Sequence, residues 1–409
     1  MPGKCRFCGH PLTHTFVDLG VSPLSNRYLT AEQLHQMEPF YPLHAYVCDR
    51  CFLVQLEEFE TPEHIFNDYA YFSSYSDSWL EHARQYTNMI VPRLRLNTSS
   101  RVIEIASNDG YLLQFFRQKG IPVLGIEPAA NVAQVAERAG IQTLARFFGE
   151  NLAKELADQS INADLLIGNN VLAHVPDIND FIRGMKLLLA PHGTITIEVP
   201  HLARLIEQNQ FDTIYHEHFS YFSFLTAEQI FRYHQLTIFD VEELSTHGGS
   251  LRVYAKHTED GTRDVSDRVR KIKEWEISKS YNRLDLYITF GKRVHDVKCQ
   301  LLSFLISAKH QGKRVAGYGA PAKGNTLLNY CGIRTDFVDF TVDRNPNKQG
   351  RFLPGTHIPI FAPEKIDEVK PDYLLILPWN LRDEIMQQMS RIRGWGGKFV
   401  IPIPESMVL

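Results

Sequence analysis

The chain has 409 residues, 44% of them hydrophobic, and its 43 Lys and Arg against 47 Asp and Glu give a formal net charge of −4. This length predicts about two to three domains, and the charge lacks the basic excess of nucleic-acid-binding proteins. No apolar run reaches the roughly 18 residues of a membrane span, and the polar start is unlike a secretory signal. We therefore expect a cytoplasmic protein with neither nucleic acid nor membrane as partner.

Two C-x-x-C pairs, Cys5 with Cys8 and Cys48 with Cys51, mark the first sixty residues. Each pair places two thiolates on one side of a tight turn, and two pairs complete a tetrahedral zinc site. Such a closed site is structural because no coordination position is open. Redox use calls for a single pair beside a βαβ unit, so redox or free thiols are the weaker alternative.

His10 and His14 could replace a cysteine ligand, but surface histidines are the simpler interpretation. Strand-like stretches at 42–47 and 52–56 complete a small zinc-binding β unit, which we predict over residues 1–62.

The stretch 68–75 is rich in tyrosine and serine, including Tyr69, Tyr71, Ser73 and Ser74. It is either an aromatic staple between two domains or a loop that faces a substrate. A helix is expected to follow at 79–93.

A strand, turn and helix start lie at 101–117. Residues 101–105 have the β-branched content of a buried parallel strand. The polar turn 107–110 then leads to a helix N-terminus, where backbone N–H groups face a ligand. A second strand, 123–127, ends in Glu127, and an acid at this position usually binds ribose hydroxyls. The pattern predicts a cofactor that contains adenosine.

The turn departs from the dinucleotide pattern G-x-G-x-x-G. Ala106 and Asn108 replace the first two glycines, and Gly110 remains. The sequence resembles motif I of S-adenosylmethionine-dependent methyltransferases, whose cationic cofactor suits nearby carboxylates better than a pyrophosphate would. An α/β domain with fortuitously acidic strand ends is the alternative. The candidate cofactor residues are Glu104, Ala106, Ser107, Asn108, Asp109, Gly110, Glu127, Pro128, Phe148 and Asn169.

Strand and helix patterns alternate through the rest of the middle region, which predicts a doubly wound sheet over residues 63–283. The expected helices are 130–139 and 178–189, and the expected strands are 142–145, 163–167, 193–199, 236–244 and 250–257. Ligands of such sheets lie at the carboxyl ends of the strands, where Asn169 and His174 fall.

The segment 211–222 contains Tyr215, His216, Glu217 and His218 in succession. A histidine with a nearby carboxylate suits a general base, and a tyrosine hydroxyl can donate to a developing oxyanion. These side chains suit proton abstraction beside a carbonyl. A metal site is disfavoured because the spacing of H-E-x-x-H is missing; a buried aromatic–histidine cluster is the structural alternative.

A Gly pair follows His247, which is either a turn residue or a site residue. Charged residues 264–284 predict a helical linker, and 287–311 a long helix. Gly317, Gly319, Lys323 and Gly324 then stand at a strand–turn–helix junction that resembles a phosphate cradle. With strands expected at 337–342, 373–379 and 399–401, a second Rossmann-like α/β domain is predicted over 284–409. A degenerate nucleotide fold that binds nothing is the alternative.

Together these motifs resemble the sugar C-3 methyltransferases of bacterial deoxysugar pathways, over nearly the whole chain. The motifs are the paired C-x-x-C, Tyr69 to Ser74, Glu104 to Gly110, Tyr215 to Phe219, His247 to Gly249 and Gly317 to Gly324. The resemblance implies a monomeric three-domain enzyme with a structural zinc domain, an S-adenosylmethionine domain and a C-terminal domain that helps to bind a nucleotide-sugar.

The implied substrate is a thymidine-diphosphate-linked 4-keto-deoxyhexose, whose ketone acidifies the C3 proton. His218 matches the base, Tyr215 its enolate-stabilising partner and Glu217 an acid that orients the site or binds substrate. His174, Tyr69 and Tyr71 would help to hold the sugar. The remaining candidate substrate residues are Ser73, Ser74, His247, Gly319 and Lys323.

The resemblance implies that the C3 carbanion takes the methyl group and leaves S-adenosylhomocysteine and a branched sugar. An O- or N-methyltransferase for another nucleotide-sugar or small molecule is a second hypothesis. A zinc-domain scaffold with two vestigial nucleotide folds is a third.

Overall fold

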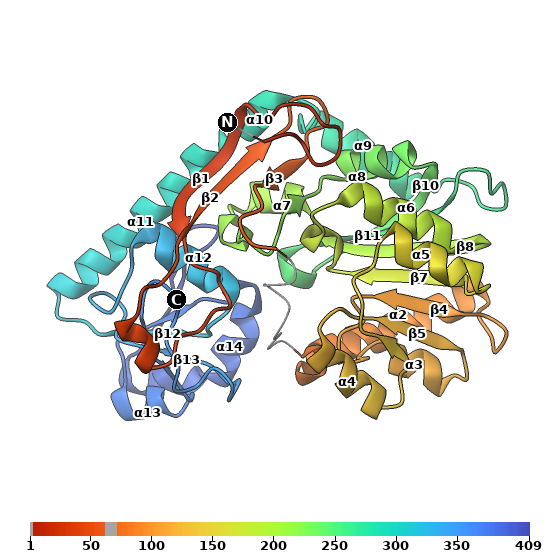
Figure 1. Cartoon of the computed structure of the whole chain (residues 1–409). Coiled ribbons are helices and arrows are strands. Elements are labelled where there is room, and N and C mark those ends of the chain that lie inside the picture. Colours follow the sequence, from red (N-terminus) through yellow and green to blue (C-terminus); the bar gives the residue numbers. More distant parts are fainter. Residues whose placement is uncertain (1–2, 62–71) are drawn as a thin grey trace.

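The computed structural model describes residues 3–61 and 72–409. Its strands form sheets of four, seven and six strands. Figure 1 shows the N-terminal strands at the top, the seven-stranded sheet at the right and the last domain at the left. This confirms the predicted fold class: a small N-terminal β unit followed by two Rossmann-like α/β domains.

The four-stranded sheet has the order β1-β2-β3-β9. Its first three strands are antiparallel neighbours from the N-terminal module: β1 (His14–Ser22), β2 (Tyr41–Val47) and β3 (Val54–Leu56). The fourth strand, β9 (Ser220–Tyr221), comes from the segment that contains His218. The first sheet thus combines strands from both sides of the predicted domain limit at residue 62. The predicted limits at 62 and 283 stay predictions.

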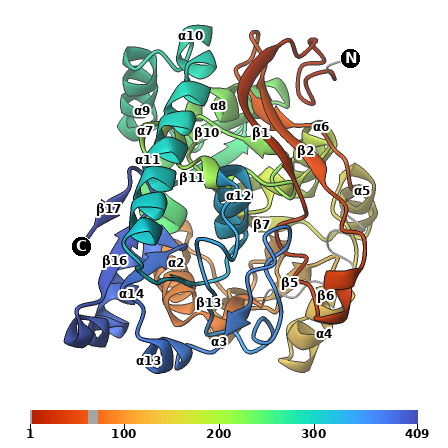
Figure 2. The same ribbon diagram turned by 90° about the vertical axis from the view of Figure 1, so that its left-hand side faces the viewer.

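The face of the N-terminal sheet that carries Phe16 and Leu43 is buried against two helices, α10 (Leu284–Ile288) and α11 (Phe290–His310). The rings of Phe16 and Phe290 stack with their centroids 4.6 Å apart. Figures 1 and 2 show α11 running from this sheet to the C-terminal domain. The long helix predicted at 287–311 begins at Phe290, three residues later than predicted, because residues up to Ile288 belong to α10.

The central sheet has the order β10-β11-β8-β7-β4-β5-β6, with β10 and β11 antiparallel. Its strands are β4 (Val102–Ile105), β5 (Val123–Ile126), β6 (Thr143–Leu144), β7 (Ala163–Asn169), β8 (Leu189–Pro200), β10 (Leu236–Leu244) and β11 (Ser250–His257). All four residues of β4 are buried, as expected for a central parallel strand covered on both faces.

The helices of this region are α2 (Asp77–Leu94), α3 (Leu113–Gln118), α4 (Ala130–Arg138), α5 (Glu150–Asp158), α6 (Ile178–Leu188), α7 (Leu202–Glu207), α8 (Phe224–Tyr233) and α9 (Asp267–Ser278). The helix start predicted at Tyr111 falls two residues later, and the charged linker forms α9.

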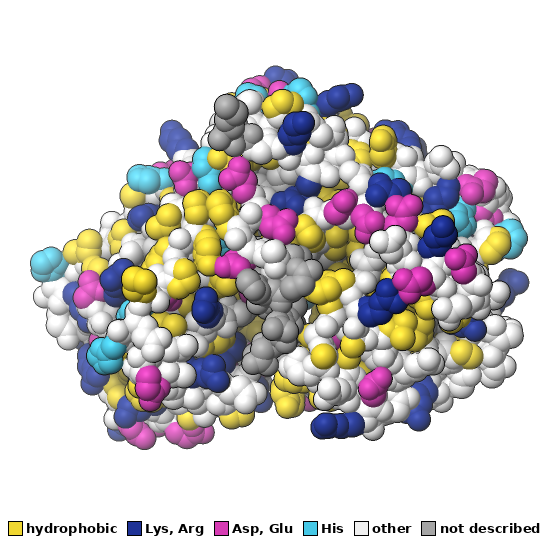
Figure 3. All heavy atoms as spheres, viewed as in Figure 1, with side chains coloured by type: hydrophobic (Ala, Val, Ile, Leu, Met, Phe, Trp, Pro, Cys, Tyr) yellow, Lys and Arg dark blue, Asp and Glu magenta, His cyan; other side chains and the backbone are white. Residues whose placement is uncertain are grey.

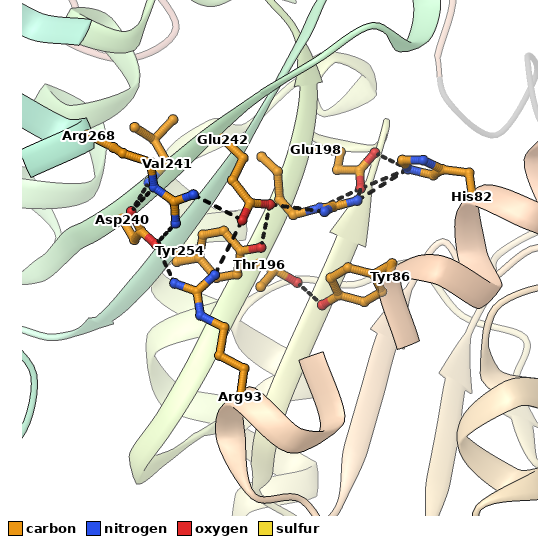
Figure 4. A network of polar contacts seen from close by, with 11 residues as sticks. His82, Tyr86, Arg93, Thr196, Glu198, Asp240, Val241, Glu242, Tyr254 and Arg268 are labelled. Atoms are coloured by element: carbon orange, nitrogen blue, oxygen red, sulfur yellow. Dashed lines mark hydrogen bonds and ion pairs between the residues drawn. The ribbon is translucent and has the colours of Figure 1, made fainter. Parts of the chain in front are cut away.

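A chain of alternating charges fastens α2 to the sheet (Figure 4). Arg252 on β11 donates through Nε to Glu198 on β8 at 2.7 Å and through Nη1 to Glu242 on β10 at 3.1 Å. His82 on α2 lies 3.0 Å from the second oxygen of Glu198. Glu198 is only 1% exposed, so its charge depends on these partners.

The C-terminal sheet has the order β14-β13-β12-β15-β16-β17, and β17 alone is antiparallel to its neighbour. The strands are β12 (Val315–Tyr318), β13 (Thr341–Val342), β14 (Ile360–Phe361), β15 (Tyr373–Ile376), β16 (Lys398–Ile401) and β17 (Met407–Val408). The helices are α12 (Ala322–Cys331), α13 (Lys365–Val369) and α14 (Arg382–Gln388).

One strand prediction in this domain is wrong for most of its length. The stretch 337–342 forms a strand only at Thr341–Val342. The amides of Phe337 and Val338 both donate to the carbonyl of Arg334, which closes a helical turn instead. The β-branched and aromatic composition hid this local bonding.

None of the described helices combines the length and the apolar character needed to cross a membrane. On the face shown in Figure 3, lysine and arginine side chains are interspersed with aspartate and glutamate. This mixed surface agrees with the small net charge of −4.

Candidate active site

The turn after β4 has the backbone shape expected of a glycine-rich cofactor loop. Ala106 has φ 56°, Asn108 φ 49° and Gly110 φ 79°, all in the left-handed region. Left-handed geometry costs an alanine roughly 1–2 kcal/mol. The chain adopts the left-handed turn at this cost, although two of the expected glycines are missing. Backbone strain of this kind is typical of functional sites.

Glu127 holds this turn from the neighbouring strand. One of its carboxylate oxygens accepts from the amide of Asn108 at 3.0 Å, and the other accepts from the amide of Ala129 at 2.9 Å. Burial raises the pKa of Glu127, and the same two amides oppose that rise. Pro128, between Glu127 and Ala129, is half-buried. Each carboxylate oxygen keeps a second lone pair that can accept from a ligand hydroxyl.

The polar atoms around the turn fit S-adenosylmethionine. Glu104 is fully buried, and burial raises its pKa well above the ordinary value. The Tyr111 hydroxyl acts against this rise in the pKa. Within the described residues, Ser107 Oγ and Asp109 Oδ1 are buried without a hydrogen-bond partner. Unsatisfied buried oxygens are costly. A cationic ligand with ammonium and hydroxyl donors, such as this cofactor, would satisfy them.

Two predicted substrate residues lie against the cofactor turn. The amide of Ser73 donates to Asn108 Oδ1 at 2.8 Å, and Ser74 donates to Asp109 Oδ2 through its amide at 3.1 Å and also through Oγ. These contacts connect the short helical turn Ser73–Tyr75, which precedes α2, to the cofactor turn. Tyr69 and Tyr71 lie outside the described residues.

An aromatic group that sequence reasoning missed borders the same turn. The ring of Trp79 stacks on Tyr111 with centroids 5.9 Å apart, and it meets His247 edge-on at 5.2 Å. His247 Nε2 lies 3.3 Å from Asn170 Nδ2, and burial lowers its pKa to about 4. His247 is thus a turn residue, with φ 55°, that also lies beside the predicted cofactor site.

The two other predicted cofactor residues follow neighbouring strands: Asn169 is the last residue of β7, and Phe148 lies in the loop after β6. Asn169 Nδ2 donates to the Tyr111 hydroxyl at 3.4 Å. Phe148 packs edge-on against Phe181 of α6, with centroids 5.3 Å apart.

The hydrogen bonds of His218 define its tautomer. Nδ1 lies 2.9 Å from the carbonyl of Thr213. A carbonyl only accepts, so Nδ1 carries the proton and Nε2 has the free electron pair. The Tyr215 hydroxyl lies 2.9 Å from Nε2 and donates to it. Nε2 is therefore the basic atom, and a phenol lies next to it.

The surroundings of His218 keep it neutral. Burial lowers its pKa well below the ordinary value, and the nearby His174, His247 and Lys323 lower it further. The His174 and His218 rings meet edge-on with centroids 4.7 Å apart, and burial lowers the pKa of His174 to about 4. At neutral pH His218 is thus in the form that accepts a proton.

The carboxylate next to His218 in sequence does not tune it. Glu217 accepts from Asn26 Nδ2 of the N-terminal module at 2.7 Å, whereas the partner of His218 is the Thr213 carbonyl. The sequence-based pairing is wrong because Glu217 lies in a tight turn, closed by the His218 amide donating to the Tyr215 carbonyl at 2.8 Å, and its carboxylate is bound by Asn26 instead. Burial raises the pKa of Glu217 to about 7.

Lys323 brings a positive charge from the C-terminal domain to the imidazoles. Its Nζ lies 4.6 Å above the centre of the Trp379 ring and donates to Asn380 Oδ1 at 2.9 Å. Trp379 Nε1 donates across the domain junction to Asp212 at 2.7 Å. Burial lowers the pKa of Lys323, and Asp212 opposes this shift. Neither Asp212 nor Trp379 stands in a motif that would have predicted this role.

The glycine-rich turn before α12 is partly filled by the chain itself. Gly319 has φ 86° and packs so closely that an added Cβ would lie 2.6 Å from Pro378. The amide of Ala320 donates to Asp343 Oδ2 at 2.8 Å. The amide of Gly319 also donates, to the carbonyl of Val342 at 2.6 Å, so two N–H groups of the predicted phosphate cradle are already paired.

The four predicted metal ligands form one cluster. The sulfur atoms of Cys5, Cys8, Cys48 and Cys51 all lie within 4.8 Å of one another. A tetrahedral arrangement of four thiolates fits zinc. His10 and His14 instead pair with Asp49, at 3.1 and 3.5 Å, and stay outside the cluster.

The left-handed turn after β4 and the buried acids Glu104 and Glu127, on this seven-stranded sheet, are typical of an S-adenosylmethionine-dependent methyltransferase. Family models match along the chain: a zinc-binding domain over residues 5–66, a methyltransferase domain over 79–241 and a C-methyltransferase C-terminal domain over 245–404. C-methyltransferase NovU of Streptomyces niveus is 37% identical over 406 residues, which cover 99% of this chain and 96% of that protein. The chain belongs to this C-methyltransferase family.

More distant matches are confined to part of the chain. A ubiquinone biosynthesis O-methyltransferase of Azorhizobium caulinodans is 29% identical over 101 residues, 24% of this chain and 39% of that protein. The crystal structure of the Burkholderia thailandensis 1,6-didemethyltoxoflavin-N1-methyltransferase covers 51% of this chain and 95% of that chain, with 17% identity and a TM-score of 0.37.

Proposed function

We propose that this C-methyltransferase acts on C3 of a 4-keto-deoxyhexose linked to thymidine diphosphate, in the biosynthesis of a branched deoxysugar. The supporting observation is the neutral His218 imidazole, whose Nε2 pair accepts from the Tyr215 phenol while Nδ1 donates to the Thr213 carbonyl. A carbon nucleophile needs a base to create it, whereas the electron pair of an oxygen or nitrogen nucleophile is already present. We further propose a monomeric, cytoplasmic enzyme.

In the proposed reaction His218 Nε2 removes the C3 proton. The electron pair of the broken C–H bond moves toward the ketone, whose oxygen becomes an enolate oxygen. Tyr215, which donates to Nε2 at 2.9 Å without substrate, would turn its hydroxyl to this oxygen. One oxyanion donor of this kind contributes about 10²- to 10³-fold. Bound S-adenosylmethionine supplies an electrophilic methyl group, so the products are the C3-methylated sugar and S-adenosylhomocysteine.

The remaining predicted site residues are assigned to binding. Glu104, Asp109 and Glu127 would hold the cationic cofactor at the β4 turn, with the side chains of the turn around it. Lys323 would bind the diphosphate, since its ammonium is held on Trp379 without a direct carboxylate contact in the described structure. His174, Glu217 and His247 would surround the sugar. The four cysteines would hold a structural zinc ion.

Labelled-methyl transfer across a panel of nucleotide-linked ketosugars tests this function. We expect turnover of thymidine-diphosphate 4-ketosugars and a new quaternary or tertiary C–CH₃ signal at C3 in the NMR spectrum of the product. Sugars reduced to the 4-alcohol are the matched control and should give no product, because their C3 proton is not acidic. A methyl signal on oxygen or nitrogen would contradict the proposal.

A further inference from the structure

The segment that carries the proposed base is fastened to the N-terminal module. In β9, Tyr221 pairs with Val54 and Ser220 pairs with Gln55. The amide of Leu56 donates to the carbonyl of Phe219, the residue after His218, at 3.0 Å. The position of His218 therefore depends on β3, which follows the second cysteine pair.

Arg6, inside the first cysteine pair, bridges two parts of the site. Its Nη2 donates to the carbonyl of Leu56 at 2.5 Å, and its Nη1 donates to the carbonyl of Pro176 at 2.7 Å. The guanidinium carbon lies 5.3 Å from the centre of the Phe219 ring. One planar group thus touches β3, the catalytic segment and the loop that begins two residues after His174.

Two further hydrogen bonds connect this bridge to the first cysteine pair. The amide of Arg6 donates to Gln55 Oε1 at 2.9 Å, and Gln55 Nε2 donates to Cys5 Sγ at 3.2 Å. Gln55 is only 1% exposed, so both bonds are shielded from water. The fork of an arginine fixes two acceptors in one plane, which a lysine cannot do.

We propose that Arg6 is a positioning residue for methyl transfer: it fixes the His174 and His218 imidazoles relative to each other from inside the first cysteine pair. The two rings lie 4.7 Å apart and come from segments that Arg6 joins. The inference rests on the proposed function, which gives His218 its role. It also gives the N-terminal module a part in the reaction beyond holding a metal.

The second cysteine pair supplies a matched control. Arg50 precedes Cys51, and its side chain is exposed. We expect Arg6→Ala to lower kcat about 10²-fold, the size of effect that a small misplacement of reacting groups produces. Arg6→Lys should lower kcat by a smaller factor, because a single ammonium reaches only one of the two carbonyls. Arg50→Ala should retain the wild-type kcat. Zinc content and S-adenosylhomocysteine affinity, measured by calorimetry, should be unchanged in all three.

Hydrogen exchange supplies a readout that does not depend on turnover. In Arg6→Ala and Arg6→Lys, the amides of residues 216–221 should exchange faster than in the wild type, and Arg50→Ala should match the wild type. If Arg6→Ala loses zinc, Arg6→Lys decides the question at full zinc content. Wild-type kcat and exchange in Arg6→Lys would then overturn the proposal.

The outcomes also separate this inference from the proposed function. If His218→Ala keeps full activity while the Arg6 variants lose kcat and exchange faster at 216–221, the base assignment fails, and Arg6 still positions this segment for turnover. If His218→Ala is inactive while Arg6→Ala matches Arg50→Ala in kcat and exchange, the positioning role fails and the base assignment stands.

Discussion

Replacing His218 by alanine is expected to lower kcat by about 10²- to 10⁴-fold, the usual contribution of a general base. The reason is that in the proposed reaction Nε2 of His218 accepts the C3 proton, and alanine leaves the Tyr215 hydroxyl without that partner. Affinity for S-adenosylhomocysteine should be unchanged, because His218 lies outside the turn after β4. Labelled-methyl transfer and calorimetry measure the two quantities.

The pH dependence checks the same assignment. Burial holds the pKa of His218 well below its ordinary value, so the imidazole is neutral and active at neutral pH. The kcat of the wild type should stay constant as pH falls toward the ordinary histidine range and decline only below it. A variant that keeps wild-type kcat, or a wild-type decline centred near the ordinary histidine pKa of about 6.5, would contradict the role.

The second large effect is on stability. Replacing Arg252 by leucine removes the guanidinium between Glu198 and Glu242 and leaves His82 as the remaining contact of the buried Glu198 carboxylate. Breaking a buried ion pair from one side costs about 3–5 kcal/mol. We expect a lower urea midpoint and faster amide exchange in β8 and β11, which together report on the central sheet.

Two companion variants isolate the cause. Replacing Glu198 as well, in Arg252→Leu with Glu198→Leu, should recover much of the loss, since no buried charge is left alone. Arg84→Leu, which removes an exposed pair with Glu81 on the same helix, should leave the midpoint unchanged. A midpoint for Arg252→Leu equal to that of Arg84→Leu would show that the network does not stabilise the sheet.

Local patterns made most of the fold predictable. The β-branched run 102–105 and the turn after it are encoded in consecutive residues, so strand, turn and helix could be read directly. The four cysteines were equally clear, because metal chemistry restricts both residue type and spacing. The prediction of a strand at 337–342 was wrong because the hydrophobic pattern does not reveal the backbone turn at Arg334.

Contacts between distant segments were not predictable. Nothing in the sequence indicates that Ser220 and Tyr221 complete the N-terminal sheet, because two residues carry no periodicity. The partner of Glu217 is Asn26 and that of Asp212 is Trp379, each from another part of the chain. The tautomer of His218 depends on the Thr213 carbonyl, a backbone atom that every residue type supplies.

Deuterium exchange at C3 of the substrate tests the central claim most directly. The enzyme is incubated in D₂O with a thymidine-diphosphate 4-ketosugar and S-adenosylhomocysteine, which allows proton removal but no methyl transfer. The account predicts that the wild type incorporates deuterium at C3 and that His218→Ala does so no faster than buffer. Equal incorporation by the two proteins, or none by the wild type, would contradict it.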